Sequence, residues 1–148
     1  MNYIQEMRLV WLTLFSVAAI AQTEAPQGQR AVLTAQAKGV QIYACQQGKW
    51  TFQAPEAALF EGAKQIGTHG AGPQWTLTGG RSVKGQVVAK ADAPATGDIP
   101  WLLLKGEGGF EYIRRWDTHG GVAPAGVCED GKTLRVPYTA TYTFYRAR

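Results

Sequence analysis

Two histidines and a few carboxylates are the residues of this chain best suited to acid–base or metal chemistry. His69 lies in a glycine-rich stretch, and histidine titrates near neutral pH, so it could act as a general base or as a metal ligand. With His119 and either Asp117 or Glu56 it could form a two-histidine, one-carboxylate metal site. That site requires two distant loops to meet. We favour the simpler interpretation, in which His69 hydrogen-bonds backbone groups and fixes a turn, and we predict no metal and no other cofactor.

The sequence gives less support to the other two catalytic arrangements, a pair of carboxylates and a serine nucleophile. Glu56 and Glu61 flank an alanine-containing segment, and two carboxylates about 5–9.5 Å apart could hydrolyse a glycoside. A carboxylate in the first turn of a short helix is also favoured electrostatically, and we prefer that role for Glu56. No serine lies in a G-x-S-x-G setting. The catalytic candidates are therefore His69, Glu56 and Asp117, and we favour a protein without catalytic activity.

Aromatic side chains are abundant, with five Trp, six Tyr and five Phe in the chain. Exposed rings stack on sugars and other flat ligands, whereas buried rings form the core of a small β domain. Trp75 and Trp101 are the better surface candidates, because each adjoins a loop with Pro and Gly. Arg114 shares a strand face with two aromatic residues, where it could stack on the rings, bind an anion or form a plain cross-strand pair. The candidate ligand-binding residues are thus His69, Trp75, Trp101 and Arg114.

Short β-strands are expected to position these side chains. Period-two alternation recurs between glycines and prolines, and it is clearest from Tyr138 to Tyr145, where aromatic residues and threonines alternate. We predict an all-β fold, a single antiparallel sandwich or flattened barrel of seven to nine strands. Pro55–Phe60 is the one helix-like stretch and predicts at most one short helical turn. The glycine-dense Gly62–Pro73 is predicted as loop.

The N-terminal residues are typical of an export signal. Leu9 to Ala21 is an uncharged, largely apolar run preceded by Arg8, too short for a membrane span of about 20 residues. We predict a signal peptide at 1–21, a flexible leader at 22–34 and a single β domain at 35–148. An uncleaved anchor is the alternative, and Met1 and Met7 both remain possible starts. The chain after cleavage is predicted to contain no integral membrane segment and to be secreted or periplasmic.

The two cysteines indicate how the fold is cross-linked, and the net charge bears on whether the protein binds nucleic acid. Cys45 and Cys128 are the only cysteines, and in an oxidising compartment an even pair most simply forms one disulfide. Two free thiols remain the alternative. The net charge is +4, and the chain contains no Lys/Arg-rich run. We therefore predict no binding to nucleic acid.

Seven motifs occur in a recognisable order along the chain. They are Gly39–Cys45 (GVQIYAC), Ala54–Ala57 (APEA) with Leu59, Ile66–His69 (IGTH) leading into Ala71–Pro73 and Trp75, Ile99–Leu104 (IPWLLL), Thr118 with Gly120-Gly121 and Ala123-Pro124, Cys128, and Val136–Ala140 (VPYTA) with Tyr142 and Phe144-Tyr145.

Together these motifs resemble the exported bacterial and fungal proteins of the domain of unknown function 3455 family, over about Ala35 to Arg146. The resemblance implies a single exported domain without an established activity. It also implies that His69 and both cysteines belong to the family pattern, whereas the position of His119 varies.

The combined prediction is an exported, non-catalytic module that binds a small molecule, glycan or envelope component through the loops near His69 and Trp75. One alternative is a hydrolase or metal-dependent enzyme centred on His69. Another is a structural or stress-related envelope protein. The ligand and the oligomeric state are left open by the sequence.

Overall fold

The protein is described here from a computed structural model, which describes residues 22–148. The predicted signal peptide at 1–21 lies outside the described residues. These described residues form eight antiparallel strands, which confirms the all-β prediction. They are β1 (Gln29–Gln46), β2 (Lys49–Glu61), β3 (Lys64–Gly70), β4 (Gln74–Leu77), β5 (Ser82–Ala91), β6 (Trp101–Glu107), β7 (Tyr112–Gly120) and β8 (Thr133–Ala147).

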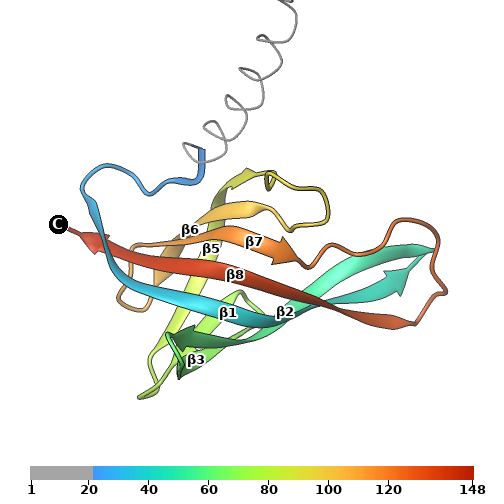
Figure 1. Cartoon of the computed structure of the whole chain (residues 1–148), viewed down its shortest axis with the longest axis horizontal. Helices are drawn as coiled ribbons and strands as arrows, with labels where there is room; N and C mark the ends of the chain where they lie inside the picture. The colour runs from blue at the N-terminus through green and yellow to red at the C-terminus, as the bar shows by residue number, and fades with distance from the viewer. Residues whose placement is uncertain (1–21) are drawn as a thin grey trace, which may run out of the picture.

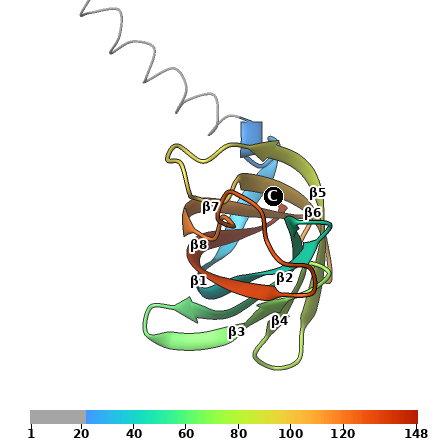
Figure 2. The same ribbon diagram turned by 90° about the vertical axis from the view of Figure 1, so that its right-hand side faces the viewer.

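The strands form a closed barrel in sequence order. Each strand pairs with the next one along the chain, and β8 returns to pair with β1 over a ladder from Gln29↔Ala147 to Ala44↔Thr133. The first and last strands run side by side along the length of the molecule (Figure 1), and the view in Figure 2 shows the strands surrounding the interior. Of the two predicted architectures, the barrel is the one observed. Closure leaves no unpaired sheet edge along β1 or β8.

The inner face of β8 confirms the alternation found in the sequence. Tyr138, Ala140, Tyr142 and Phe144 are each at most 3% exposed and belong to the hydrophobic core. The threonines between them lie on the outer face, where Thr143 accepts a hydrogen bond from the indole N–H of Trp116 at 3.0 Å. The period-two pattern therefore separates the barrel interior from an outer layer of polar contacts.

The predicted helical turn at Pro55–Phe60 does not form, and these residues belong to strand β2. Pro55 pairs with Gln41 of β1, whereas pairing between β2 and β3 begins only at Ala57. A proline is tolerated in a strand where its missing N–H is not needed for the ladder. Local helix signals were therefore overridden by pairing with β1.

The prediction of a loop over Gly62–Pro73 was wrong for most of its length, because Lys64–Gly70 forms β3. Gly67 pairs with Leu77 of β4, and a Cβ at Gly67 would collide with the backbone oxygen of Thr76. This glycine allows two strands to approach closely. Strand β1 also begins earlier than the predicted domain boundary, so that residues 29–34 of the predicted leader pair with β8.

A second glycine, Gly39 in β1, provides a test of this close packing. A Cβ at Gly39 would lie 2.5 Å from the Cα of Ala57 and would overlap the backbone oxygen of Glu56. We expect Gly39→Ala to lower the free energy of unfolding by about 1–3 kcal/mol, because backbone atoms cannot move aside without disturbing the ladder. Gly70→Ala is the matched control, since nothing lies within 4 Å of its added Cβ. Urea denaturation of both variants measures the difference, and equal midpoints would contradict it.

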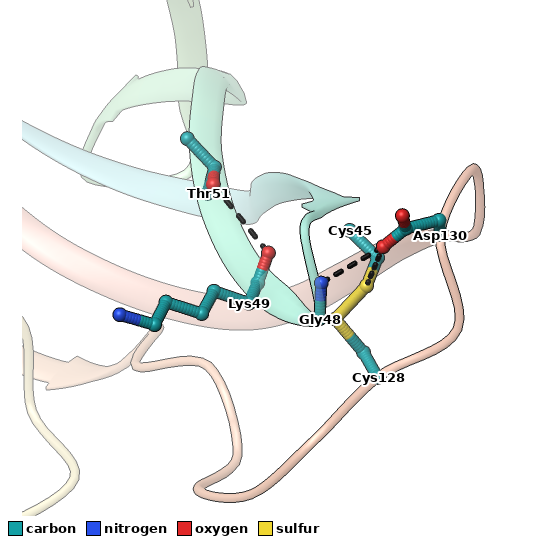
Figure 3. Close-up of a disulfide and its surroundings, with 6 residues drawn as sticks. All are labelled: Cys45, Gly48, Lys49, Thr51, Cys128 and Asp130. Atoms are coloured by element: carbon teal, nitrogen blue, oxygen red, sulfur yellow. Dashed lines mark hydrogen bonds between the residues drawn. A yellow bond between two sulfur atoms is a disulfide. The ribbon is translucent and has the colours of Figure 1, made fainter.

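The predicted disulfide between Cys45 and Cys128 is present, with the two Cα atoms 5.9 Å apart. Figure 3 shows that it joins the end of β1 to the long loop between β7 and β8. In the same place the carboxylate of Asp130 accepts a hydrogen bond from the backbone N–H of Gly48 at 2.8 Å. The backbone N–H of Cys128 donates to the carbonyl of Gly48 at 3.2 Å. The loop is thus held on the β1–β2 turn by covalent and hydrogen bonds.

Residues 22–148 contain no helix with the length and apolar character needed to cross a membrane.

Candidate functional site

A cavity of about 230 Å³ is bordered by inward-lying side chains of the barrel. Most of its wall is apolar, and the exposed side chains of Phe52 and Val87 lie at its border. Eight-stranded barrels are wide enough to hold one small ligand inside. The side chains that matter for recognition come from five different strands and are His69, Trp75, Leu102, Leu104, Arg115 and Tyr142.

His69 lies on β3 with its ring on the inner side of the barrel. Its register partners Ala57 and Trp75 both belong to the core. The imidazole is stacked on the Trp75 indole, with ring centroids 4.5 Å apart, and meets the Tyr142 ring edge-on at 5.0 Å. The side chain is 4% exposed. This residue is therefore part of a buried aromatic cluster and not an exposed loop histidine.

The hydrogen bond of His69 determines its tautomer. Its Nδ1 lies 2.9 Å from the carbonyl oxygen of Gln74, and a carbonyl only accepts, so Nδ1 carries the proton. Burial lowers the pKa of His69 to about 4, although the Gln74 carbonyl acts in the opposite direction. At neutral pH the ring is uncharged and Nε2 is a hydrogen-bond acceptor. The predicted backbone hydrogen bond across the turn is thus observed.

Trp75 and Trp101 were the better candidates for exposed aromatic residues, but both are buried. Trp75 is 1% exposed and Trp101 is 9% exposed. The indole of Trp75 fits inside because Gly85 on β5 has no side chain, since a Cβ there would lie 2.9 Å from the ring. Its indole nitrogen is buried without a hydrogen-bond partner among residues 22–148. Trp75 consequently borders the cavity from the interior.

Arg115 is the functional candidate that the sequence analysis missed. It pairs with Leu102 and Tyr142 across the sheet, and its half-buried side chain borders the cavity with them. Its Nε donates to the carbonyl of Pro100 at 2.9 Å. The signal was available in the alternation of the chain, because placing Arg114 on one face of the strand puts Arg115 on the opposite, core-facing side.

The charge of Arg115 acts on several groups of the interior. It lowers the pKa of His69 further, after burial has done so. Burial raises the pKa of Tyr142, and the charge of Arg115 opposes that rise. The phenol of Tyr142 therefore stays protonated at neutral pH, beside a permanent cation and a neutral imidazole.

Arg114 lies on the outer side of the barrel and packs between two indoles. Its guanidinium carbon is 5.6 Å from the ring of Trp101 and 5.5 Å from the ring of Trp116. It also donates to the hydroxyl of Thr23 at 3.5 Å. Stacking on aromatic rings, one of the three roles considered for Arg114, is observed. Neither Trp101 nor Arg114 borders the cavity.

The acidic candidates are not brought together. Glu56 and His69 both border an open hollow beside β3, but the carboxylate of Glu56 is exposed and forms an ion pair with Arg135 at 3.0 Å. Hydrogen bonds from Arg135 lower the pKa of Glu56. Asp117 pairs instead with the exposed ring of His119 at 3.2 Å. In the described part of the chain, no three His, Cys, Asp or Glu residues are grouped so as to hold a metal ion.

Comparison with known proteins gives one result. A family described as "Protein of unknown function (DUF3455)" matches residues 26–146. No curated protein and no solved structure matches the chain.

Proposed function

This chain belongs to the DUF3455 family, and we propose that it is an exported, non-catalytic protein that binds one small molecule inside its barrel. The observation that carries the proposal is the cavity of about 230 Å³. An apolar wall with a few convergent polar groups is typical of small-molecule sites. Here the polar groups are the Arg115 guanidinium, the His69 imidazole and the Tyr142 phenol. A glycan platform on the surface is less well supported, because Trp75 and Trp101 are buried.

The chemistry of His69 supports binding over catalysis. A general base acts best when its pKa lies near the working pH, whereas burial holds the pKa of this imidazole at about 4. Glu56, which borders the same open hollow as His69, is on the outer face and bound to Arg135. The imidazole is suited to accept a hydrogen bond from a bound molecule through Nε2.

Two features support export. The disulfide between Cys45 and Cys128 spans 83 residues, and such bonds form and persist in oxidising compartments. The apolar segment at 9–21, with its small residues before the proposed cleavage point, has the pattern of a signal peptide.

The proposal is tested by blocking the entrance of the cavity. Val87 and Val88 are adjacent on β5 and are 48% and 53% exposed, but only Val87 borders the cavity. We expect Val87→Trp to weaken binding of small aromatic fragments at least tenfold, because the new indole occupies the entrance, while Val88→Trp binds like the wild type. Fragments of about ten non-hydrogen atoms, screened by ligand-observed NMR and thermal shift, provide the readout. Equal binding by both variants would place the fragments elsewhere and remove the cavity as the site.

A further inference from the structure

The cavity contains a feature that selects among small molecules. Arg115 is the one charged side chain among the described residues that border it, since His69 is neutral. The other recognition residues present an apolar or aromatic surface. A site with one cation and an otherwise apolar wall discriminates by charge as well as by shape.

No carboxylate of the described chain neutralises Arg115. Within residues 22–148 the ion pairs are those of His119 with Asp117 and of Arg135 with Glu56. Arginine is charged at every physiological pH and has five N–H donors, of which the Pro100 carbonyl accepts the one on Nε. A ligand that covered this half-buried cation would remove it from water, which is unfavourable unless the ligand supplies an anion beside it. The terminal amino groups of Arg115 can supply a bidentate pair of hydrogen bonds to a carboxylate.

The apolar side chains and the volume of the cavity determine what kind of ligand can accompany the charged group. The Trp75 indole and the side chains of Leu102 and Leu104 provide an apolar wall, and Nε2 of His69 provides one acceptor. A cavity of about 150 Å³ lined by apolar side chains holds benzene. The larger volume here, about 230 Å³, is enough for one ring or a branched chain with a short acidic arm, about ten non-hydrogen atoms in all.

We propose that the ligand of this barrel is a small monocarboxylate with an aromatic or branched apolar body, its carboxylate bound by Arg115 and its body packed against Trp75, Leu102 and Leu104. This inference depends on the proposed function, because it names the class of molecule that the same cavity takes. It adds the sign of the ligand's charge, the orientation of the ligand in the cavity and its approximate size.

The test compares molecules of one shape and different charge. Phenylacetate, phenylacetamide and 2-phenylethylamine are titrated into the full protein at pH 7.5 by calorimetry, with the total tryptophan fluorescence as a second readout. We expect phenylacetate to bind at least tenfold more tightly than the amide, and the amine to bind more weakly than the amide. Higher salt should weaken binding of the carboxylate more than binding of the amide.

Variants then assign the preference to one residue. Arg115→Gln should reduce the affinity for phenylacetate at least tenfold and leave that for the amide within about threefold, so that the preference disappears. Arg115→Lys should retain part of the preference, because it keeps the charge and loses the bidentate geometry. Arg135→Gln is the matched control, since it removes the same charge from an exposed position and should keep the wild-type preference. Thermal unfolding verifies that each variant is folded.

The two proposals fail in different ways. If wild-type protein binds the amide as tightly as the carboxylate, and Val87→Trp blocks both, the inference about charge is overturned and the binding function stands. If none of the three molecules binds to wild-type protein, both proposals are overturned. The comparison within wild-type protein decides the matter even if Arg115→Gln does not fold.

Discussion

Removing the disulfide should lower the free energy of unfolding by about 4–5 kcal/mol. Cys45 and Cys128 are 83 residues apart, and the bond restricts the unfolded chain in proportion to the logarithm of that loop. Single domains are stabilised by about 5–15 kcal/mol in total. The double variant Cys45→Ala/Cys128→Ala is therefore expected to retain only a fraction of the wild-type stability. Guanidinium denaturation of oxidised wild-type protein and of the double variant measures the difference.

Reduction provides the control for the cysteine variant. Wild-type protein treated with a reductant should unfold at the denaturant concentration of the double variant, and the double variant itself should not respond to the reductant. The hydrogen bonds between the long loop and Gly48 do not depend chemically on the disulfide, and we expect them to persist in both cases. An unchanged midpoint on reduction would mean that these bonds, and not the disulfide, hold the loop.

Acidification should destabilise the barrel through His69, by about 3 kcal/mol. Its pKa is about 4 in the folded protein against 6.5 for an unperturbed histidine, so between these pH values the unfolded chain binds a proton that the folded chain does not. The contribution of His69 to the free energy of unfolding is therefore fully present above pH 6.5 and is lost as the pH falls towards 4. Below that value this group causes no further change in stability. Urea denaturation at a series of pH values from 3.5 to 7.5 follows the loss.

A neutral substitution isolates this contribution from that of the carboxylates. His69→Asn keeps a side-chain N–H donor for the Gln74 carbonyl and does not titrate, so its stability should depend less steeply on pH than that of wild-type protein. His119→Asn removes an exposed histidine and should follow the wild-type curve. Parallel curves for wild type and His69→Asn would show that the imidazole titrates in the folded protein as it does in the unfolded chain.

The parts of the fold that were predictable are those where one strand face is buried and the other is not. In β8 the aromatic residues alternate with threonines, and all four inward positions are in the core. The fold class followed from several such patterns. Strand β3 lacks this alternation of buried and exposed side chains, because Gly67 contributes no side chain. The position of Gly67 in the sheet depends instead on its close approach to the backbone of Thr76. Such tertiary contacts leave no period in the sequence.

The candidate site was predicted in part. His69 and Trp75 border one cavity, although glycines and a proline beside Trp75 suggested an exposed position. Arg115 was missed because a charged residue next to Arg114 is most simply assigned to solvent. Strand alternation places the two neighbouring arginines on opposite sides of the sheet, and the register shows which side each takes, with Arg114 between two indoles and Arg115 toward the cavity.

The pairing of the first strand with the last one has a consequence for the order of events during synthesis. Gln29 is opposite Ala147, so the longest ladder of the sheet joins residues from nearly opposite ends of the described chain. Contacts of this separation are slow to form, because a long loop must be ordered first. A nascent chain that lacks β8 cannot close the barrel, so the pairing of β1 with β8 must follow the synthesis of nearly the whole described domain.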